Sequence, residues 1–450
     1  MILAADIGTS SLKAGLLSPS GELRKRVCVH YRRPPGLGGE EFNPLEWEWA
    51  FCEALRQLPA ASITAVGISG NGPTLVPTDE QGNPLAPAVM WHQERGVPLE
   101  GQPSYYLPKA AWLKAHESAW PRTRWLFSPP EWLQFRLTAR PSMGIPHETF
   151  QPYVWDENQI KAYGFDSKIF PEPVVMGRLA GRVTREGSAL SGLPEGTLFA
   201  AVGSDFMAAL LGSGTVEPGM VCDRAGTSEG INYCARQPSG NPLLRDLPHL
   251  MEGLWNVAAI LPSTGAVFEW YRRLIDHQNK PYEETLAAVD GIAAGLEAPL
   301  FFPGHRNGIP WSFAGGSLHY MEPWHGGAHI GRAVMEAIAY GVRRGIELLE
   351  ASGMRTQEIR VSGGQARGRV WNQMKADITN RRLYIPMIED AELAGCAACA
   401  VKALGGADSL LEAAACFVSA RYVVEPRQEI TQIYNESYRR YLEQERTLSG

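Results

Sequence analysis

The sequence predicts an α/β protein made of two domains of the same type, and three observations support this prediction. The 450 residues are enough for two or three domains of ordinary size. Short apolar strand patterns alternate with helical patterns along most of the chain. The tripeptide Gly-Thr-Ser occurs at 8–10 and again at 226–228, a separation close to half of the chain. Duplication of one domain would produce that spacing, and chance recurrence of a tripeptide is the alternative.

The first part of the chain predicts three strands, a helix and a fourth strand. Residues 1–29 show three apolar or alternating runs separated by turns rich in Gly, Ser and Pro, which is the pattern of a β-meander. A helix is expected over 45–58, after Asn43-Pro44, and the β-branched run 63–69 returns as a strand. This order is that of a ribonuclease-H-like α/β domain.

The second Gly-Thr-Ser also lies between two predicted strands, at 220–223 and 230–234. We therefore place a domain boundary near 216, which gives one domain over 1–216 and another over 217–450. The Pro-rich and Trp-rich stretch 98–175 has weak periodicity, and we interpret it as an insertion on the substrate side. Further predicted elements are helices over 265–275, 330–352, 371–379 and 391–404, and strands over 359–362 and 383–386.

Composition and charge exclude several classes of function. The 42 basic and 48 acidic side chains give a net charge of −6, so no global attraction to nucleic acid or to anionic lipid is expected. Seven scattered cysteines fit a reducing compartment, and the sequence has no apolar run of about 18 residues. We therefore expect a cytoplasmic protein. Cys396 and Cys399 have CxxC spacing, but they lie in a run of small residues, which favours close helix packing over redox or metal chemistry.

The turn at 8–11 is a candidate phosphate site. Successive backbone N–H groups in a turn of Gly, Thr and Ser point into one space that suits a phosphate, and Lys13 could add a cation. Asp6, at the end of a buried strand, could hold Mg²⁺, which needs only one or two carboxylates beside phosphates and water. The alternative is an ordinary β-hairpin in which Asp6 hydrogen-bonds the turn.

Two other segments combine a strand end with residues suited to chemistry. Asp205 is expected at a helix start after the strand 198–202, where it is either an N-cap or a general base that takes a proton from a substrate hydroxyl. Gly363 and Gly364 follow a strand and would let a planar ligand approach the backbone, although a helix cap or plain turn has the same composition. The sequence contains neither a GxGxxG fingerprint nor a P-loop.

The order of five motifs is more specific than any one of them, and it resembles the FGGY carbohydrate kinases of the actin, hexokinase and heat-shock ATPase superfamily. The resemblance covers nearly the whole chain. The motifs are Asp-x-Gly-Thr-Ser-x-x-Lys at 6–13, Gly-x-Asp-x-x-Ala-x-x-Gly at 203–212, Gly-Thr-Ser at 226–228, Ser-Gly-Gly-x-Ala at 362–366 and Glu-x-Ala-x-x-Ala-Gly-x-Ala at 389–397. In the second motif the last glycine, Gly212, lies one place beyond its ideal position.

The resemblance implies two ribonuclease-H-like domains around a hinged cleft, with sugar bound by the first and nucleotide by the second. It implies ATP and Mg²⁺ as cofactors, Asp6 as a metal-positioning residue and Asp205 as the catalytic base. The implied nucleotide contacts are Gly8, Thr9, Ser10 and Lys13 in the first loop, Gly226, Thr227 and Ser228 in the second, and Gly363, Gly364 and Asn372 around adenosine.

The substrate segments depart from the family pattern. Xylulose kinases carry Met-His-Gly, and glycerol kinases Arg-Glu, where this chain has Asn71-Gly72-Pro73. The usual Trp-x-Asp-x-Arg is Trp-His-Gln-Glu-Arg at 91–95, which loses a carboxylate unless Glu94 replaces it. The predicted substrate contacts are Asn71, Trp91, Glu94, Arg95 and Asp205, and the sugar itself is unassigned.

We therefore expect an ATP-dependent kinase that phosphorylates a hydroxyl of a small sugar, ketose or polyol. The expected partner is that small molecule, without nucleic acid or membrane, and a homodimer is compatible with the sequence. Two other functions are considered. One is a nucleotide-binding interaction protein of the actin or heat-shock type, and the other is a degenerate sugar sensor that binds without phosphoryl transfer.

Overall fold

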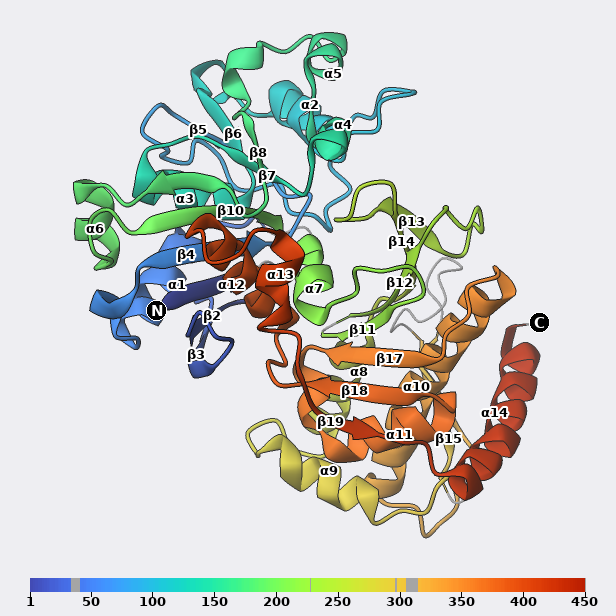
Figure 1. Ribbon diagram of the computed structural model, residues 1–450. Coiled ribbons are helices and arrows are strands. Elements are labelled where there is room, and N and C mark those ends of the chain that lie inside the picture. Colours follow the sequence, from blue (N-terminus) through green and yellow to red (C-terminus); the bar gives the residue numbers. More distant parts are fainter. Residues whose placement is uncertain (34–40, 227, 296–297, 305–314, 450) are drawn as a thin grey trace. The chain divides into compact units, whose positions relative to one another are not determined.

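The computed structural model describes residues 1–33, 41–226, 228–295, 298–304 and 315–449 (Figure 1). The chain forms two compact units. The first unit contains Met1–Gly214, Leu250–Glu252 and Asp390–Ser419, and the second contains Thr215–His249, Gly253–Glu389 and Ala420–Gly450. Sequence reasoning placed 390–419 in the second domain, whereas the structure packs this segment into the first unit.

The first unit is built on a six-stranded sheet with strand order β3-β2-β1-β4-β10-β9. Its strands are β1 (Ile2–Ile7), β2 (Ser11–Leu17), β3 (Leu23–His30), β4 (Ala65–Gly70), β9 (Leu179–Arg182) and β10 (Leu198–Ser204). The three consecutive strands β1 to β3 are antiparallel, and β4 and β10 extend the sheet in parallel with β1. Since the parallel strands β1, β4 and β10 end at the same edge, the turns and helix that follow them meet there.

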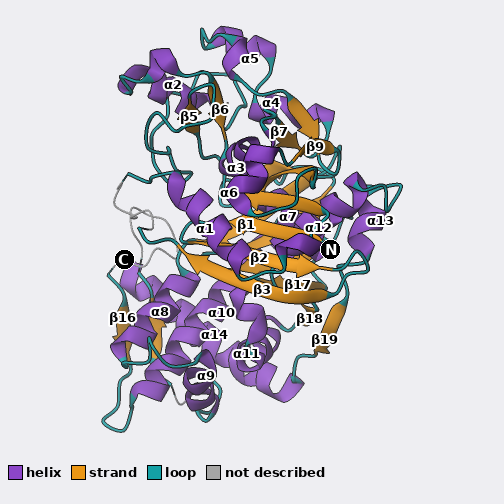
Figure 2. Ribbon diagram, turned by 90° about the vertical axis from the view of Figure 1, so that its left-hand side faces the viewer, coloured by secondary structure: helices purple, strands orange, loops and turns teal. Residues whose placement is uncertain are grey.

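Helices cover both faces of this sheet (Figure 2). Helices α1, α3 and α6 pack together on one face, over a core that includes Trp47 and Trp132. Helices α7 and α12 pack against each other on the other face. The bounds are α1 (Leu45–Arg56), α3 (Pro129–Thr138), α6 (Arg185–Ser191), α7 (Asp205–Ser213) and α12 (Ala391–Ala403).

Small residues explain why α12 belongs to the first unit. A Cβ on Gly212 of α7 would lie 1.9 Å from the Ala391 carbonyl oxygen, and one on Gly395 would lie 2.0 Å from the Ala208 oxygen. Such backbone approach requires glycine. Cys396 and Cys399 are fully buried free thiols on this helix, so the prediction of close helix packing there is confirmed. Figure 1 shows α12 and the following α13 (Leu410–Ala415) beside α7.

Shorter elements between β4 and β9 complete the first unit, including the stretch 98–175. Residues 107–116 form a helix, and two small two-stranded sheets join β5 to β6 and β7 to β8. The bounds are β5 (Val76–Thr78), α2 (Leu107–His116), β6 (Trp125–Phe127), β7 (Met143–Ile145), α4 (Gln151–Val154), α5 (Glu157–Ala162) and β8 (Pro173–Val175).

The second unit repeats the strand order of the first. Its sheet has the order β13-β14-β12-β11-β17-β18-β19, in which β14-β12-β11-β17-β18 has the same directions as β3-β2-β1-β4-β10. The repeated topology agrees with the duplication that the two Gly-Thr-Ser turns predict. The strands are β11 (Val221–Ala225), β12 (Glu229–Ala235), β13 (Arg245–Pro248), β14 (Trp255–Leu261), β17 (Glu358–Ser362), β18 (Arg382–Pro386) and β19 (Ala420–Val424).

Helices α10 and α11 pack side by side against this sheet, and α14 lies against them with Tyr434 and Tyr441 in the core. A two-stranded sheet of β15 and β16 lies beside α10. Among the helices of the described ranges, none has the length and apolar character needed to cross a membrane. The bounds are α8 (Thr264–Leu274), α9 (Tyr282–Asp290), β15 (Leu300–Phe302), β16 (Ser317–His319), α10 (Gly327–Ala351), α11 (Arg369–Thr379) and α14 (Gln428–Ser449).

Candidate active site

The first Gly-Thr-Ser turn joins β1 to β2 as a tight hairpin. The Gly8 N–H donates to the Ser11 carbonyl at 3.0 Å, and the Tyr31 hydroxyl donates to the Gly8 carbonyl at 3.0 Å. Hydrogen bonds to the carbonyl oxygens of Gly8 and Ser11 therefore hold the turn in place. Thr9 is half-buried and Ser10 is exposed, so both side chains reach the solvent.

Asn71, predicted to contact substrate, holds this turn instead. Its Nδ2 donates to the carbonyls of Ile7 at 3.0 Å and Gly8 at 3.2 Å, and its Oδ1 accepts from Thr74 at 2.7 Å. An amide has two donors, and both are used within the fold. In the structure, therefore, the Asn71 amide holds the backbone at the start of the turn 8–11.

A cluster of carboxylates lies at the edge of the first sheet. Asp6 is only 5% exposed and accepts a hydrogen bond from Ser69 at 2.8 Å. Burial, followed by the negative charges of Glu392 and Asp205, raises the pKa of Asp6 to about 8. The positive charge of Lys13 lowers the pKa of Asp6, but this effect is smaller than the combined effect of burial and the two negative charges.

Lys13, predicted to line the phosphate turn, is bound to a carboxylate. It pairs across the hairpin with Asp6 in strand register, and its Nζ forms an ion pair with Asp390 at 2.9 Å. Arg26 reaches the same carboxylate at 2.5 Å. Lys13 and Arg26 overcome the effect of burial and hold the pKa of Asp390 far below its usual range, so this pair of cations is anchored to the start of α12.

Asp205 is the first residue of α7, directly after β10. Ser204 occupies the N-cap position, and the Asp205 Oδ1 accepts from the N–H of Phe206 at 2.6 Å. The side chain is half-buried, and a helix N-terminus stabilises its negative charge. The N-cap interpretation is therefore off by one residue, and the carboxylate is accessible at the edge that also carries Asp6.

A second buried acid fixes this strand-to-helix junction. Glu131 of α3 accepts the Gly144 N–H at 3.1 Å and also bonds the Ser128 hydroxyl. Gly144 lies so close to β10 that a Cβ there would be 2.6 Å from the Gly203 nitrogen. Because Gly203 immediately precedes Ser204, this contact sets the direction in which α7 begins.

The segment 91–95 lies next to the first turn. The Trp91 indole N–H donates to the Thr9 hydroxyl at 3.1 Å, and the ring is 44% exposed. Glu94 is exposed, and the Arg95 guanidinium stacks on the Trp112 ring at 4.7 Å. The structure thus joins Trp91 to the first turn, whereas Arg95 contacts Trp112.

Sequence reasoning missed Lys109, which binds the backbone of this segment. Its Nζ donates to the carbonyls of Met90 at 2.8 Å and Gln93 at 2.9 Å. Burial and then the nearby charge of Arg95 lower the pKa of Lys109 to about 8. A lysine on the apolar face of α2, between Leu107 and Leu113, was the signal that could have identified it.

The second Gly-Thr-Ser turn joins β11 to β12, and the Gly226 N–H donates to the Ser228 carbonyl at 2.8 Å. Thr227 lies outside the described residues. Directly behind the turn, Lys375 of α11 is enclosed by two carboxylates, those of Asp223 at 2.7 Å and of Glu229. All three side chains are at most 1% exposed. Burial and the charge of Asp223 raise the pKa of Glu229 to about 8.

The paired glycines behave differently from each other. Gly363 has φ +90°, and a Cβ there would lie 2.3 Å from the Ala225 carbonyl oxygen. At Gly364 no described atom lies within 4 Å of the position of a Cβ, so the open space for a planar ligand is at Gly364. Asn372, predicted to contact adenosine, is buried and donates to the Ala366 carbonyl at 2.8 Å, so it holds the turn 363–366.

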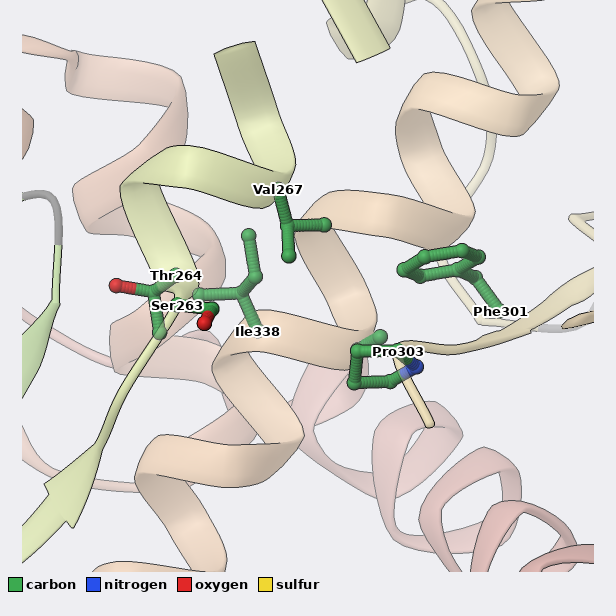
Figure 3. A pocket seen from close by; sticks show the side chains of 7 residues that line it. Ser263, Thr264, Val267, Phe301, Pro303 and Ile338 are labelled. Atoms are coloured by element: carbon green, nitrogen blue, oxygen red, sulfur yellow. The ribbon is translucent and has the colours of Figure 1, made fainter. Parts of the chain in front are cut away.

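Two hollows of the second unit are not candidates for this site. One has a volume of about 10 Å³ and lies between α8, α10 and β15, lined by Val267, Ile338 and Phe301 among others (Figure 3). That is room for about one water molecule. The other, of about 360 Å³, includes Met220 and Glu358 at the starts of β11 and β17. Ligands of α/β sheets bind at the carboxyl ends of parallel strands, which is the opposite edge.

Two sheets with one strand order, each carrying a Gly-Thr-Ser hairpin turn, define an α/β ATPase of the actin and hexokinase type. The chain belongs to the FGGY family of carbohydrate kinases: the model of the family's N-terminal domain matches residues 1–100, and that of its C-terminal domain matches 224–404. It is therefore an enzyme that uses ATP to phosphorylate a small carbohydrate. The interaction-protein alternative is not favoured.

Individual relatives agree with this assignment. The chain is 25% identical to the xylulose kinase of Bacillus subtilis over 98% of this chain and 95% of that protein. Among solved structures, it is similar to xylulose kinase from Rhodospirillum rubrum, with a TM-score of 0.77 and 21% identity over 99% and 98% of the two chains. Gluconate kinase from Lactobacillus acidophilus gives a TM-score of 0.79 and 19% identity over 100% and 98%. These structural likenesses establish the fold.

Proposed function

We propose that Asp205 is the general base that deprotonates a hydroxyl of a small sugar, ketose or polyol. The observation that carries this proposal is the half-buried Asp205 carboxylate on the first turn of α7, beside the buried Asp6. As the acceptor oxygen attacks the terminal phosphorus of ATP, its proton passes to Asp205 and the bond to ADP breaks. Positioning and charge stabilisation supply most of the catalysis in phosphoryl transfer.

The two Gly-Thr-Ser turns would bind the phosphates of ATP. Thr9 and Ser10 in the first turn, and Ser228 in the second, offer hydroxyl and backbone donors, while Gly226 closes the second turn through its N–H. Gly364 would lie against the adenosine, because its open space admits a planar ring. In this proposal the first unit binds the acceptor and the second binds the nucleotide.

The residues around Asp6 fit the Mg²⁺ that such a kinase uses. Asp6, Asp205 and Glu392 concentrate negative charge, as the raised pKa of Asp6 records. Among the described residues, no group of three or more acidic, His or Cys side chains is arranged to hold a metal alone. Mg²⁺ typically binds one or two carboxylates together with substrate phosphates and water. Asp6 would hold the ion, which would neutralise charge that develops on the phosphoryl group.

Three predicted ligands have positioning roles in this proposal. Asn71 fixes the carbonyl side of the first turn, Asn372 fixes the turn that carries Gly364, and Lys13 is bound to Asp390. Each keeps a neighbouring turn in place, so we assign direct phosphate contacts to the turns themselves.

The test is ADP release with a panel of ketoses, aldoses and polyols that includes xylulose, glycerol and gluconate. We expect one acceptor to stand out sharply, because a polar pocket discriminates by about 10⁴ or more against ligands that leave its groups unpaired. Since segment 71–73 departs from both xylulose and glycerol kinases, neither xylulose nor glycerol should give the highest kcat/KM. Binding of sugars without ADP release from any of them would contradict the proposal and favour a sensor.

A further inference from the structure

Tyr106 is a buried side chain whose hydroxyl the fold does not use. It directly precedes α2 and is 6% exposed, with its ring edge-to-face on Trp155 at 5.8 Å between ring centroids. Within the described ranges, no hydrogen bond engages the hydroxyl. Phenylalanine would pack in these surroundings equally well, so packing does not explain the oxygen. Tyr hydroxyls at buried positions usually have a polar partner.

The hydroxyl lies at the edge of the sheet that carries the proposed base. A Cβ built on Gly72 would be 2.8 Å from the Tyr106 oxygen and 3.9 Å from the Ser204 Cβ, and Ser204 immediately precedes Asp205. The charge of Asp205 also contributes to raising the pKa of Tyr106, after burial and Glu131. The phenol therefore stays protonated and is available as a donor.

The neighbouring segment 71–73 offers no free polar side chain. Asn71 uses its amide on the backbone of the first turn, Gly72 has no side chain, and Pro73 is apolar. Because Gly72 lacks a Cβ, the Tyr106 hydroxyl is uncovered on that side. Next to Gly72, the Tyr106 hydroxyl is therefore a polar side-chain group that an acceptor could bind.

We propose that Tyr106 determines acceptor specificity by donating a hydrogen bond to a second oxygen of the sugar, distinct from the hydroxyl that Asp205 deprotonates. This inference rests on the proposed function. It defines the acceptor as a molecule with at least two oxygens in reach of Tyr106 and Asp205 together. An analogue that lacks the second oxygen cannot accept this hydrogen bond, so the tyrosine hydroxyl does not increase its kcat/KM.

The experiment compares wild type with Tyr106→Phe, using the best acceptor of the panel and its monodeoxy analogues. We expect kcat/KM for the best acceptor to fall roughly 10- to 100-fold, as for the loss of one hydrogen bond in an enclosed site, with KM for ATP and Tm unchanged. One monodeoxy analogue should be phosphorylated equally well by both enzymes, because it lacks the oxygen that Tyr106 binds.

The matched control is Tyr441→Phe, which removes a buried hydroxyl from the core of the second unit for which the described residues supply no hydrogen-bond partner. It should leave kcat/KM unchanged. Gly72→Ala provides an independent variant, since its methyl group would crowd the Tyr106 hydroxyl. It should lower kcat/KM for the best acceptor in the same way, and it should leave kcat/KM unchanged for the same monodeoxy analogue.

Two results would overturn the inference alone: wild-type kcat/KM in Tyr106→Phe, or an equal loss with every analogue. A wild-type enzyme that phosphorylates no acceptor would overturn the proposed function and this inference with it. The two failures are therefore distinguishable.

Discussion

The two Gly-Thr-Ser hairpins share their topology, but the charges behind them are arranged in opposite ways. Behind the first, Asp6 has the carboxylates of Asp205 and Glu392 nearby, while Lys13 is bound to Asp390. Behind the second, the carboxylates of Asp223 and Glu229 enclose Lys375. The first group includes the half-buried Asp205, whereas the second is closed to solvent.

We interpret the accessible cluster around Asp6 and Asp205 as part of the proposed active site. We interpret the buried cluster of Lys375, Asp223 and Glu229 as a structural brace. Carboxylates that outnumber their cations at an accessible edge favour binding of a cation or a proton. The two carboxylates around the buried Lys375 also outnumber their cation, but they are closed to solvent, and the pKa of Glu229 raised to about 8 means that one of them holds a proton. Lys375 then compensates the other and avoids the cost of an isolated buried charge. The two turns are equivalent in topology, and in the proposed function the charges around the first one assign the catalytic role to it.

The largest expected effect is that of Asp205→Asn. It removes the proposed base while keeping the size and hydrogen bonding of the side chain, so kcat on the best acceptor should fall by about 10²–10⁴. ATP affinity and Tm should change little, because Asn is also accepted at helix starts. Steady-state kinetics with calorimetric ATP titration measures both. A variant with wild-type kcat would remove Asp205 from the catalytic role.

Disrupting the brace should lower the free energy of unfolding. Lys375→Met leaves Asp223 and Glu229 buried without their cation, and removing one partner of a buried ion pair typically costs about 3–5 kcal/mol. Denaturant unfolding of Lys375→Met should show a loss of this size. Lys402→Met, on a half-buried lysine of α12 in the first unit, is the control with the same chemical change. Equal stability of the two variants would contradict the brace.

Gly364→Val tests the nucleotide side of the second turn. The new side chain enters the open space at Gly364, so ATP affinity should fall while acceptor binding and Tm are preserved. Gly326→Val places the same side chain in open space at the start of α10 and should leave ATP affinity unchanged. Calorimetric titration with unchanged ATP affinity in a folded Gly364→Val protein would exclude adenosine from this position.

The smallest expected effect is a slope of stability with pH. The folded-state pKa of Glu229, about 8, lies above its ordinary value of 4.5. The stability that its neutral form contributes is fully present below 4.5 and is lost as pH rises through about 8. Glu229→Gln mimics the neutral form, so its unfolding free energy should decline less than that of wild type between pH 5 and 8. Parallel declines would contradict this assignment.

Local patterns predicted most of the fold. The helices expected at 45–58 and 330–352 are α1 (Leu45–Arg56) and α10 (Gly327–Ala351), and the strand expected at 63–69 is β4 (Ala65–Gly70). Each has the apolar periodicity of its element, and that periodicity is local information. The turns at 8–10 and 363–364 were identified for the same reason, since Gly, Thr and Ser specify turn geometry within a few residues.

Partners that are distant in the sequence could not be predicted in this way. Asn71 looks like a ligand in its motif, yet it bonds the Ile7 carbonyl, which lies 64 positions away and which only tertiary structure brings near. Lys375 is 146 positions from Glu229 and Lys13 is 377 from Asp390, and no local pattern encodes either pair. Tyr106 gave no signal, because the sequence alone does not show that none of the described residues forms a hydrogen bond with its hydroxyl.

The position of α12 in the first unit has a consequence for the order of synthesis. Residues 390–419 are synthesised long after β10 and α7. The surface of the first sheet and of α7 that α12 covers therefore stays uncovered until most of the second unit has been synthesised. Domains usually fold as units during synthesis, beginning at the N-terminus. Here the first unit, which includes Asp390, the partner of Lys13, is completed only after residue 419 has been synthesised. Release of a truncated chain would therefore leave neither unit complete.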